Sequence, residues 1–239
     1  RKMGMLERFT DIIPGIEKWD KRYYNTQGDS AQAGNNAVTP QYNTKLVSAA
    51  EVPRTWEDLL QPKWKGHLGT PTDPKNWWTM ALAEGGWGIE KTTDFITKLK
   101  AQQPKMQTGM SQGHALLIAG DFKIYTNNYL RHVMVSQEKG APVDWARVNP
   151  VSLTGPSIIM PAAGPHPNAV RLFIEWYLSP AGMKVHEDVM GYGFAAPGSG
   201  SKLSEIVKGH TFVIRTEEVI LKAAELGLDD KFNKILTGK

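Results

Sequence analysis

The chain of 239 residues contains no cysteine. This absence excludes disulfide bonds, thiolate metal sites, iron–sulfur clusters and cysteine nucleophiles. It does not fix the compartment, because a chain of this length can be stabilised by its core without crosslinks. Long apolar runs are also missing, since the longest, Ala115–Ala119, falls far short of the roughly 18 residues that span a bilayer. We therefore expect a protein that does not span a membrane.

The chain also lacks a large excess of either positive or negative charge. The chain has 28 lysine and arginine residues against 24 aspartate and glutamate residues, which gives a formal net charge of +4, and the two signs are interspersed. Without a basic run we expect no nucleic-acid partner. The first residues, Arg1 to Leu6, carry neither an apolar segment nor a small-residue cleavage site. Any export signal is therefore expected to have been removed or never to have been present.

Motifs of the common enzyme classes are absent too. The sequence has no G-x-G-x-x-G or G-x-x-x-x-G-K-[ST] phosphate loop, no H-E-x-x-H zinc motif and no G-x-S-x-G nucleophile elbow. The six histidines are scattered, with no pair four residues apart. Each is more simply explained as a surface or core residue than as a metal ligand. We expect the protein not to be an enzyme.

What the sequence does contain is an alternation of short strands and longer helices. Periodicity and capping predict helices over residues 77–84, 89–100, 110–119, 128–139, 168–178, 183–190, 201–208, 215–226 and 230–236. Strands are predicted over residues 122–126, 143–148 and 157–161. Thr55 and Asp58 have the spacing of a capping box before a short helix. The alternation predicts an α/β protein with largely parallel sheets.

The segment from Gly120 to Leu130 holds the most informative polar residues. A predicted strand ends at Asn127 and Asn128, and a helix follows at once. Asn is a favoured N-cap, the free N–H groups of a helix start attract anions, and ligands of open α/β sheets bind beyond the carboxyl ends of strands. Tyr129 adds a phenol that can ligate a hard cation or bond to an oxyanion. The alternative is an ordinary capped helix with Tyr129 in the core.

A second turn, from Asp73 to Thr79, has the same form. It carries Asn76 and two adjacent tryptophans, Trp77 and Trp78, which cannot both face one side of a helix. One of them either stacks on a solute or fills the core, and the sequence leaves both options open. Two further candidates are Ser157 from a neighbouring turn and Arg131. The Arg131 guanidinium could contact a carboxylate or phosphate, although a solvated arginine is the simpler interpretation.

Several phrases of the sequence, taken in order, resemble those of a known family. They are YNTKLV (residues 42–47), VPRTWEDLLQPKWKG (52–66), GAPV (140–143), PHPNA (165–169) and LSPAG (178–182). From about residue 37 to 195 the chain resembles the bacterial extracellular solute-binding proteins of ABC importers. Within that family it is similar to the ferric-iron-binding proteins. The tail to Lys239 fits the closing helices of the family more loosely.

The resemblance implies a type II periplasmic binding fold. Two α/β lobes with mixed, mainly parallel sheets are joined by crossover strands, and the solute is trapped in an interlobe cleft. Residues 1–41 and 164–200 would form the remainder of lobe one, residues 42–163 lobe two, and residues 201–239 C-terminal helices that pack on lobe two. Because residues 3–6 resemble a segment that follows the family's first strand–helix units, we expect lobe one to be incomplete at its N-terminus.

The resemblance also implies a metal site, from which this sequence departs. Iron-binding relatives carry two consecutive tyrosines after an Asn pair, whereas here Tyr129 keeps the first position and Leu130 takes the second. A leucine cannot coordinate iron. Tyr129 is thus left as a single candidate metal ligand, and Fe³⁺ or another metal enters only as a transported solute, not as a cofactor.

The leading hypothesis is a substrate-binding component of an ABC-type importer that captures a small anionic or metal-associated solute. Its binding residues would be Tyr129, Asn128, Asn127, Asn76, Trp77, Ser157 and Arg131. Its partners would be that solute and an ABC permease, and its location periplasmic or extracellular. The alternative is a shortened, non-binding relative that serves as an interaction module. The sequence names neither the solute nor the oligomeric state.

Overall fold

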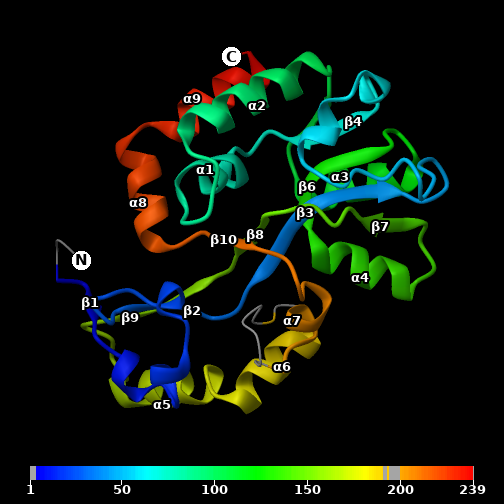
Figure 1. Ribbon diagram of the computed structural model, residues 1–239. Helices are drawn as coiled ribbons and strands as arrows, with labels where there is room; N and C mark the ends of the chain where they lie inside the picture. Colours follow the sequence, from blue (N-terminus) through cyan, green and yellow to red (C-terminus); the bar gives the residue numbers. More distant parts are fainter. Residues whose placement is uncertain (1–3, 191–192, 194–199, 239) are drawn as a thin grey trace. The chain divides into compact units, whose positions relative to one another are not determined.

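Helices and strands alternate along the chain, which confirms the expected α/β class (Figure 1). This computed structural model describes residues 4–190, 193 and 200–238. The α-helices are α1 (Lys75–Leu82), α2 (Ile89–Ala101), α3 (Met110–Ala119), α4 (Leu130–Glu138), α5 (Pro167–Tyr177), α6 (Pro180–Met190), α7 (Lys202–Ile206), α8 (Glu217–Glu225) and α9 (Leu228–Thr237). In the described part of the chain, no helix is both long and apolar enough to cross a membrane.

The strands are shorter than the helices. They are β1 (Leu6–Glu7), β2 (Ser30–Gln32), β3 (Asn36–Asn43), β4 (Leu68–Pro71), β5 (Lys105–Gln107), β6 (Ile124–Tyr129), β7 (Val143–Trp145), β8 (Val151–Thr154), β9 (Ser157–Pro161) and β10 (Phe212–Ile214). Short 3₁₀ helices lie between them: η1 (Thr10–Ile12), η2 (Ile16–Lys18), η3 (Lys21–Tyr23), η4 (Glu57–Leu60) and η5 (Pro62–Trp64).

The chain forms two compact units, each built from two segments. Unit 1 comprises Arg1–Asn36 and Thr154–Lys208, and unit 2 comprises Ala37–Leu153 and Gly209–Lys239. In unit 1, β9 pairs antiparallel with both β1 and β2, and α5 packs against β9. The buried core of unit 1 consists of Phe9, Ile13, Ala31, Ala33, Met160, Ile174 and Leu178.

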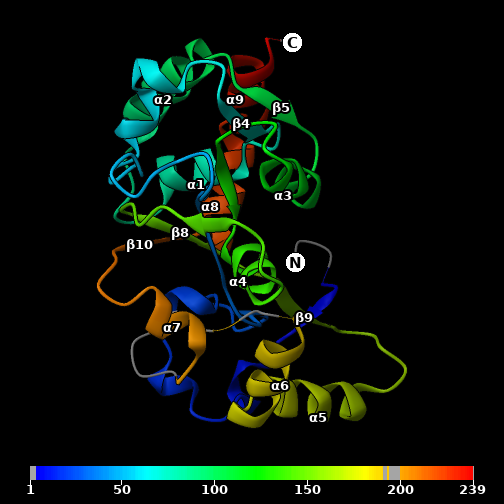
Figure 2. The same ribbon diagram turned by 90° about the vertical axis from the view of Figure 1, so that its right-hand side faces the viewer.

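These boundaries differ from those expected at residues 42, 164 and 201. The sequence predicts residues 157–161 within lobe two, but this segment is β9, whose hydrogen-bonded partners β1 and β2 belong to unit 1. Helix α7 is expected among the C-terminal helices, yet the Ser201 hydroxyl donates to the Glu187 carboxylate of α6 at 2.8 Å, within unit 1. Helices α8 and α9 do pack on unit 2, since α8 contacts α1, and α9 contacts α1 and α2 (Figure 2).

The sheet of unit 2 is mixed. Its strand order is β10-β8-β3-β6-β4-β5, and β7 pairs with β3 outside this path. Strand β4 runs parallel to β5 and β6, and β10 runs parallel to β8, whereas β3 is antiparallel to β6 and β7. Because β4 and β6 are parallel neighbours, their carboxyl ends lie at the same edge of the sheet, where α/β proteins bind ligands.

Aromatic side chains fill the core of unit 2 where η4, α1 and α2 meet. Trp56 and Trp77 are fully buried and Phe95 nearly so. The ring centroids are 5.8 Å apart for Trp56 and Trp77, and 5.3 Å apart for Trp77 and Phe95. Trp78 is only 3% exposed, so the structure buries both adjacent tryptophans. Trp77 is therefore a core residue and not the solute-stacking residue proposed from the sequence.

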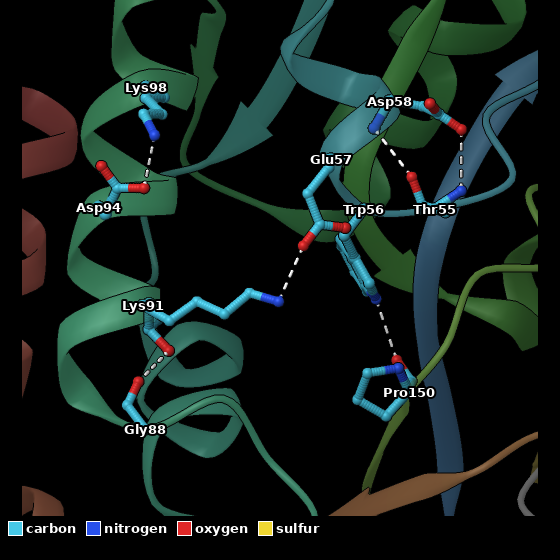
Figure 3. Close-up of polar contacts among 10 residues, drawn as sticks. Thr55, Trp56, Glu57, Asp58, Gly88, Lys91, Asp94, Lys98 and Pro150 are labelled. Carbon is cyan, nitrogen blue, oxygen red and sulfur yellow. Dashed lines mark hydrogen bonds and ion pairs between the residues drawn. The ribbon is translucent and has the colours of Figure 1, made fainter.

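The predicted capping box at Thr55 is confirmed (Figure 3). The Asp58 N–H donates to Thr55 Oγ1 at 3.2 Å, and the Thr55 N–H donates to Asp58 Oδ2 at 3.0 Å. The turn that follows is the 3₁₀ helix η4. Trp56 Nε1 donates to the Pro150 carbonyl at 3.0 Å, and Glu57 forms an ion pair with Lys91 of α2 at 2.9 Å. These contacts hold η4 against α2 and the segment that leads to β8.

Strand β6 ends later than the sequence predicts. Asn128 and Tyr129 pair with Thr39 and Val38 of β3, so the strand runs through Tyr129 and α4 begins at Leu130 instead of Asn128. The register shifts between Thr39 and Gln41, so that two residues of β6 oppose the single residue Pro40. Proline has no N–H to give to the ladder, and this explains the irregularity at that point.

Candidate functional site

Polar side chains gather in unit 2 where β4, β6 and β10 end. Strand β4 leads to Asp73 and Asn76 at the start of α1, β6 ends at Tyr129, and β10 leads directly to Arg215. Tyr129 and Asp73 both act electrostatically on Arg215, so the three strand ends lie near one another. The sequence predicts binding residues in the turn after β4 and in the turn at the end of β6, but it does not single out Arg215.

Asn127 joins the two predicted turns. Its Oδ1 accepts a hydrogen bond from Asn76 Nδ2 at 3.0 Å. Asn127 is fully buried and Asn76 is 6% exposed. Among the described residues, Asn127 Nδ2 and Asn76 Oδ1 have no hydrogen-bond partner. A buried polar atom without a partner is unfavourable by about 1–3 kcal/mol, and it marks a place where a bound molecule could complete the bonding.

Asn128 has different hydrogen-bond partners from Asn127. Its Nδ2 donates to Gln41 Oε1 at 3.0 Å, while its Oδ1 accepts from the Tyr129 N–H at 2.8 Å and lies 2.9 Å from His132 Nδ1. The side chain is fully buried. Successive side chains of a strand point to opposite faces, and Asn127 and Asn128 accordingly reach different partners. The structure therefore gives Asn128 a supporting position beneath Tyr129.

Tyr129 lies partly exposed, with Arg131 and His132 beside its ring. The Arg131 guanidinium carbon is 5.6 Å from the centre of the Tyr129 ring, and the His132 ring meets that ring edge-on at 5.7 Å. Leu130, in the position of the second tyrosine of iron-binding proteins, is 1% exposed and points into the core. The arrangement presents one phenol with guanidinium groups beside it.

Arg215 is the functional candidate that the sequence analysis missed. Its guanidinium carbon lies 5.8 Å from the Trp78 ring centre, and Trp78 Nε1 donates to Asp229 Oδ1 at 2.9 Å. Burial lowers the pKa of Arg215, whereas the Tyr129 phenol and the Asp73 carboxylate raise it. The one local signal was that Arg215 directly precedes Thr216, the N-cap of α8.

The remaining predicted site residue, Ser157, belongs to unit 1. It is the first residue of β9, is exposed, and pairs with Gln32 of β2. The structure thus brings together Asn76, Asn127, Tyr129 and Arg131 within unit 2. It places Asn128 behind them, Trp77 in the core and Ser157 in the other unit.

Two histidines lie behind the end of β6. The rings of His114 and His132 are 5.4 Å apart. Burial, then the charge of Arg131 and then His114, lowers the pKa of His132 to about 4. Burial also lowers the pKa of His114, while a hydrogen bond with the main chain of His132 raises it. Both rings are therefore neutral at pH 7.

The unfolding free energy is expected to fall as the pH is lowered from 6.5 to 5. In the unfolded chain His132 takes up a proton near pH 6.5, but in the folded chain only near pH 4, so the unfolded state binds more protons in between. His132 alone accounts for a loss of about 1.5 kcal/mol over this range. Urea denaturation of the wild type and of His132→Gln at several pH values checks this, and equal pH slopes would contradict it.

In the described part of the chain, no group of three or more histidine, aspartate or glutamate side chains could hold a metal ion. The family model for bacterial extracellular solute-binding proteins matches residues 1–208. This chain belongs to that family. Its members bind solutes and are not enzymes, in line with the expectation from the sequence. No curated protein matches the sequence significantly.

Solved structures share the fold of this solute-binding protein at low sequence identity. The Atu4243–GABA receptor has a TM-score of 0.77 at 14% identity, covering 100% of this chain and 77% of that one. Iron-bound HitA from Pseudomonas aeruginosa has a TM-score of 0.71 at 17% identity, covering 97% and 77%. AfuA from Actinobacillus pleuropneumoniae, with fructose-6-phosphate bound, has a TM-score of 0.63 at 18% identity, covering 78% and 61%. These likenesses confirm the type II periplasmic binding fold.

Proposed function

We propose that this solute-binding protein captures a small anion with a carboxylate or phosphate group at the ends of β4, β6 and β10 and delivers it to an ABC permease from the periplasm. The observation that carries the proposal is the placement of Arg215, against Trp78 and within electrostatic reach of Tyr129 and Asp73. An arginine seated on an aromatic ring at a strand end presents its fork in a defined direction, which suits a carboxylate or phosphate.

The charge around Tyr129 favours an anion over a bare metal cation. Arg131 lies over the Tyr129 ring, and Arg215 approaches from β10. Two positive groups near one phenol repel Fe³⁺ and attract an anion, with an energy of about 4 kcal/mol for unit charges 4 Å apart near a protein surface. The loss of the second tyrosine to the buried Leu130 supports the same choice.

Neutral polar groups, one donor and one acceptor, add to the proposed site. Asn127 Nδ2 and Asn76 Oδ1 lack partners among the described residues, and Asn76 belongs to the first turn of α1. The N-terminus of a helix favours negative charge through its dipole. A solute with an anionic head and a hydroxyl or amide neighbour would bond to all these groups. GABA, iron and fructose-6-phosphate in the titles of the structural neighbours belong to those proteins, so the solute class here rests on the residues of this chain.

Isothermal titration calorimetry and thermal unfolding test the proposal with inorganic phosphate, glucose 6-phosphate, succinate and ferric citrate. We expect at least one of the first three to bind, with a stabilisation of about 2.7 kcal/mol at one hundred times its Kd. Binding of ferric citrate alone would favour a metal-associated solute instead. If no solute binds, the proposal fails and the non-binding interaction module becomes the better hypothesis.

A further inference from the structure

Gln41 of β3 lies fully buried behind the end of β6. Its Nε2 donates to the backbone carbonyl of Tyr129 at 2.8 Å. Its Oε1 accepts from Asn128 Nδ2 at 3.0 Å and lies 3.0 Å from His114 Nδ1 of α3. One buried side chain thus joins the main chain of Tyr129, the neighbouring amide and a second helix.

The hydrogen-bond pattern determines where the protons lie. Because Gln41 Oε1 is an acceptor, His114 Nδ1 carries a proton and donates to it. His114 Nε2 is then free to accept from the Ser136 hydroxyl of α4 at 2.8 Å. We call this series of contacts, Ser136–His114–Gln41–Asn128, the relay. It connects α4, α3, β3 and β6.

The relay holds both main-chain polar groups of Tyr129. The Tyr129 N–H donates to Asn128 Oδ1, and the Tyr129 carbonyl accepts from Gln41. Side chains therefore fix the backbone of Tyr129 at the point where β6 ends and α4 begins. The direction of the phenol follows from that backbone, and the phenol is the group that acts on Arg215.

We propose that Gln41 is a positioning residue of the solute site, which acts through the relay to hold Tyr129 in its binding geometry. The inference rests on the proposed function. Gln41 does not touch the solute in this assignment. A Tyr129 released from the relay must be ordered again whenever a solute binds, and that ordering lowers the affinity.

The test compares Gln41→Met with Asn43→Leu in the full 239-residue chain. Both residues are buried polar residues of β3, but the Asn43 amide donates to the Leu117 and Ile118 carbonyls, away from Tyr129. We expect Gln41→Met to weaken binding of inorganic phosphate, glucose 6-phosphate or succinate, whichever the wild type binds, about tenfold. We expect Asn43→Leu to leave that affinity within twofold. Equal affinities of the two variants would overturn the proposal.

Hydrogen exchange separates the relay from the proposed function. The Tyr129 amide hydrogen is expected to exchange about tenfold faster in Gln41→Met than in Asn43→Leu, in the absence of any solute. If the wild type binds none of the three solutes, the proposed function fails while this comparison still judges the relay. Unchanged exchange at Tyr129 in Gln41→Met would show that Gln41 does not hold it.

Ser136→Ala provides a second variant in case Gln41→Met does not fold. It removes only the hydroxyl at the outer end of the relay, and alanine suits the helical position in α4. We expect about threefold faster exchange at Tyr129 and about threefold weaker binding of the same solute. Wild-type values of both quantities in this variant would overturn the proposal.

Discussion

Replacing Arg215 by glutamine is expected to weaken binding of a small anionic solute about a hundredfold. The substitution removes the charge and the guanidinium group and leaves a shorter, neutral polar side chain. Charge-assisted hydrogen bonds contribute about 1.5–3 kcal/mol each, and a hundredfold change corresponds to about 2.7 kcal/mol. The effect is expected to be large because Arg215 already lies against the Trp78 ring, which is itself held by its hydrogen bond to Asp229. A solute therefore pays little additional cost for ordering this side chain.

The matched control for this experiment is Arg147→Gln. Arg147 also belongs to unit 2 and lies over an aromatic ring, 4.7 Å from the centre of Trp145, but it is bonded to Asp144 at an exposed position. Calorimetric titration with inorganic phosphate, glucose 6-phosphate and succinate should show wild-type affinity for this control. If Arg215→Gln binds as tightly as Arg147→Gln, Arg215 is a structural arginine and the site lies elsewhere.

Elements with strong local signals could be predicted from the sequence. Helix α3 is expected to end at Gly120, and it does so because Gly120 adopts a φ of +89°, which a glycine tolerates without strain. The capping box at Thr55 is a contact between residues three apart, which spacing alone can reveal. Helix α2 has its apolar positions at helical spacing and needs no information from distant segments.

The end of β6 could not be predicted in the same way. Asn128 has the residue type of a helix N-cap, but strand β3 pairs with it from 89 positions earlier in the chain (128 − 39 = 89) and keeps it in the sheet. The same pairing decides which face each Asn uses. Strand β10 has only Phe212, Val213 and Ile214, so its existence depends on the parallel partner β8. Without β10 there was no reason to regard Arg215 as the residue at a strand end.

The tryptophan pair shows why local patterns leave a site residue undecided. Adjacent residues of a helix point in directions about 100° apart, and this alone suggests that one tryptophan faces outward. In the structure, α1 contacts α2, α8 and α9, so both directions meet other helices. The number of helices around α1 depends on the tertiary fold, which no window of the sequence contains. Burial of Trp77 therefore became visible only in the folded chain.

Replacing Trp77 by alanine is expected to lower the unfolding free energy of unit 2 by about 3–5 kcal/mol. The indole is fully buried, and it packs against Trp56 and Phe95 at ring distances of 5.8 and 5.3 Å. Removing it leaves a cavity that these stiff rings cannot close. Trp77→Phe should be much milder, because it keeps a ring and removes an indole N–H that has no partner among the described residues.

Urea unfolding followed by tryptophan fluorescence measures this effect. Trp176→Ala is the control, since Trp176 is 47% exposed on α5 of unit 1 and its loss should change the unfolding free energy by less than about 0.5 kcal/mol. The comparison also decides the role of Trp77. If Trp77 is a core residue, its replacement lowers the unfolding free energy and leaves the solute affinity of the folded chain unchanged. If it stacks on the solute, its replacement lowers the affinity and leaves the unfolding free energy unchanged. Trp77→Ala with wild-type stability and weakened binding would return Trp77 to the binding site.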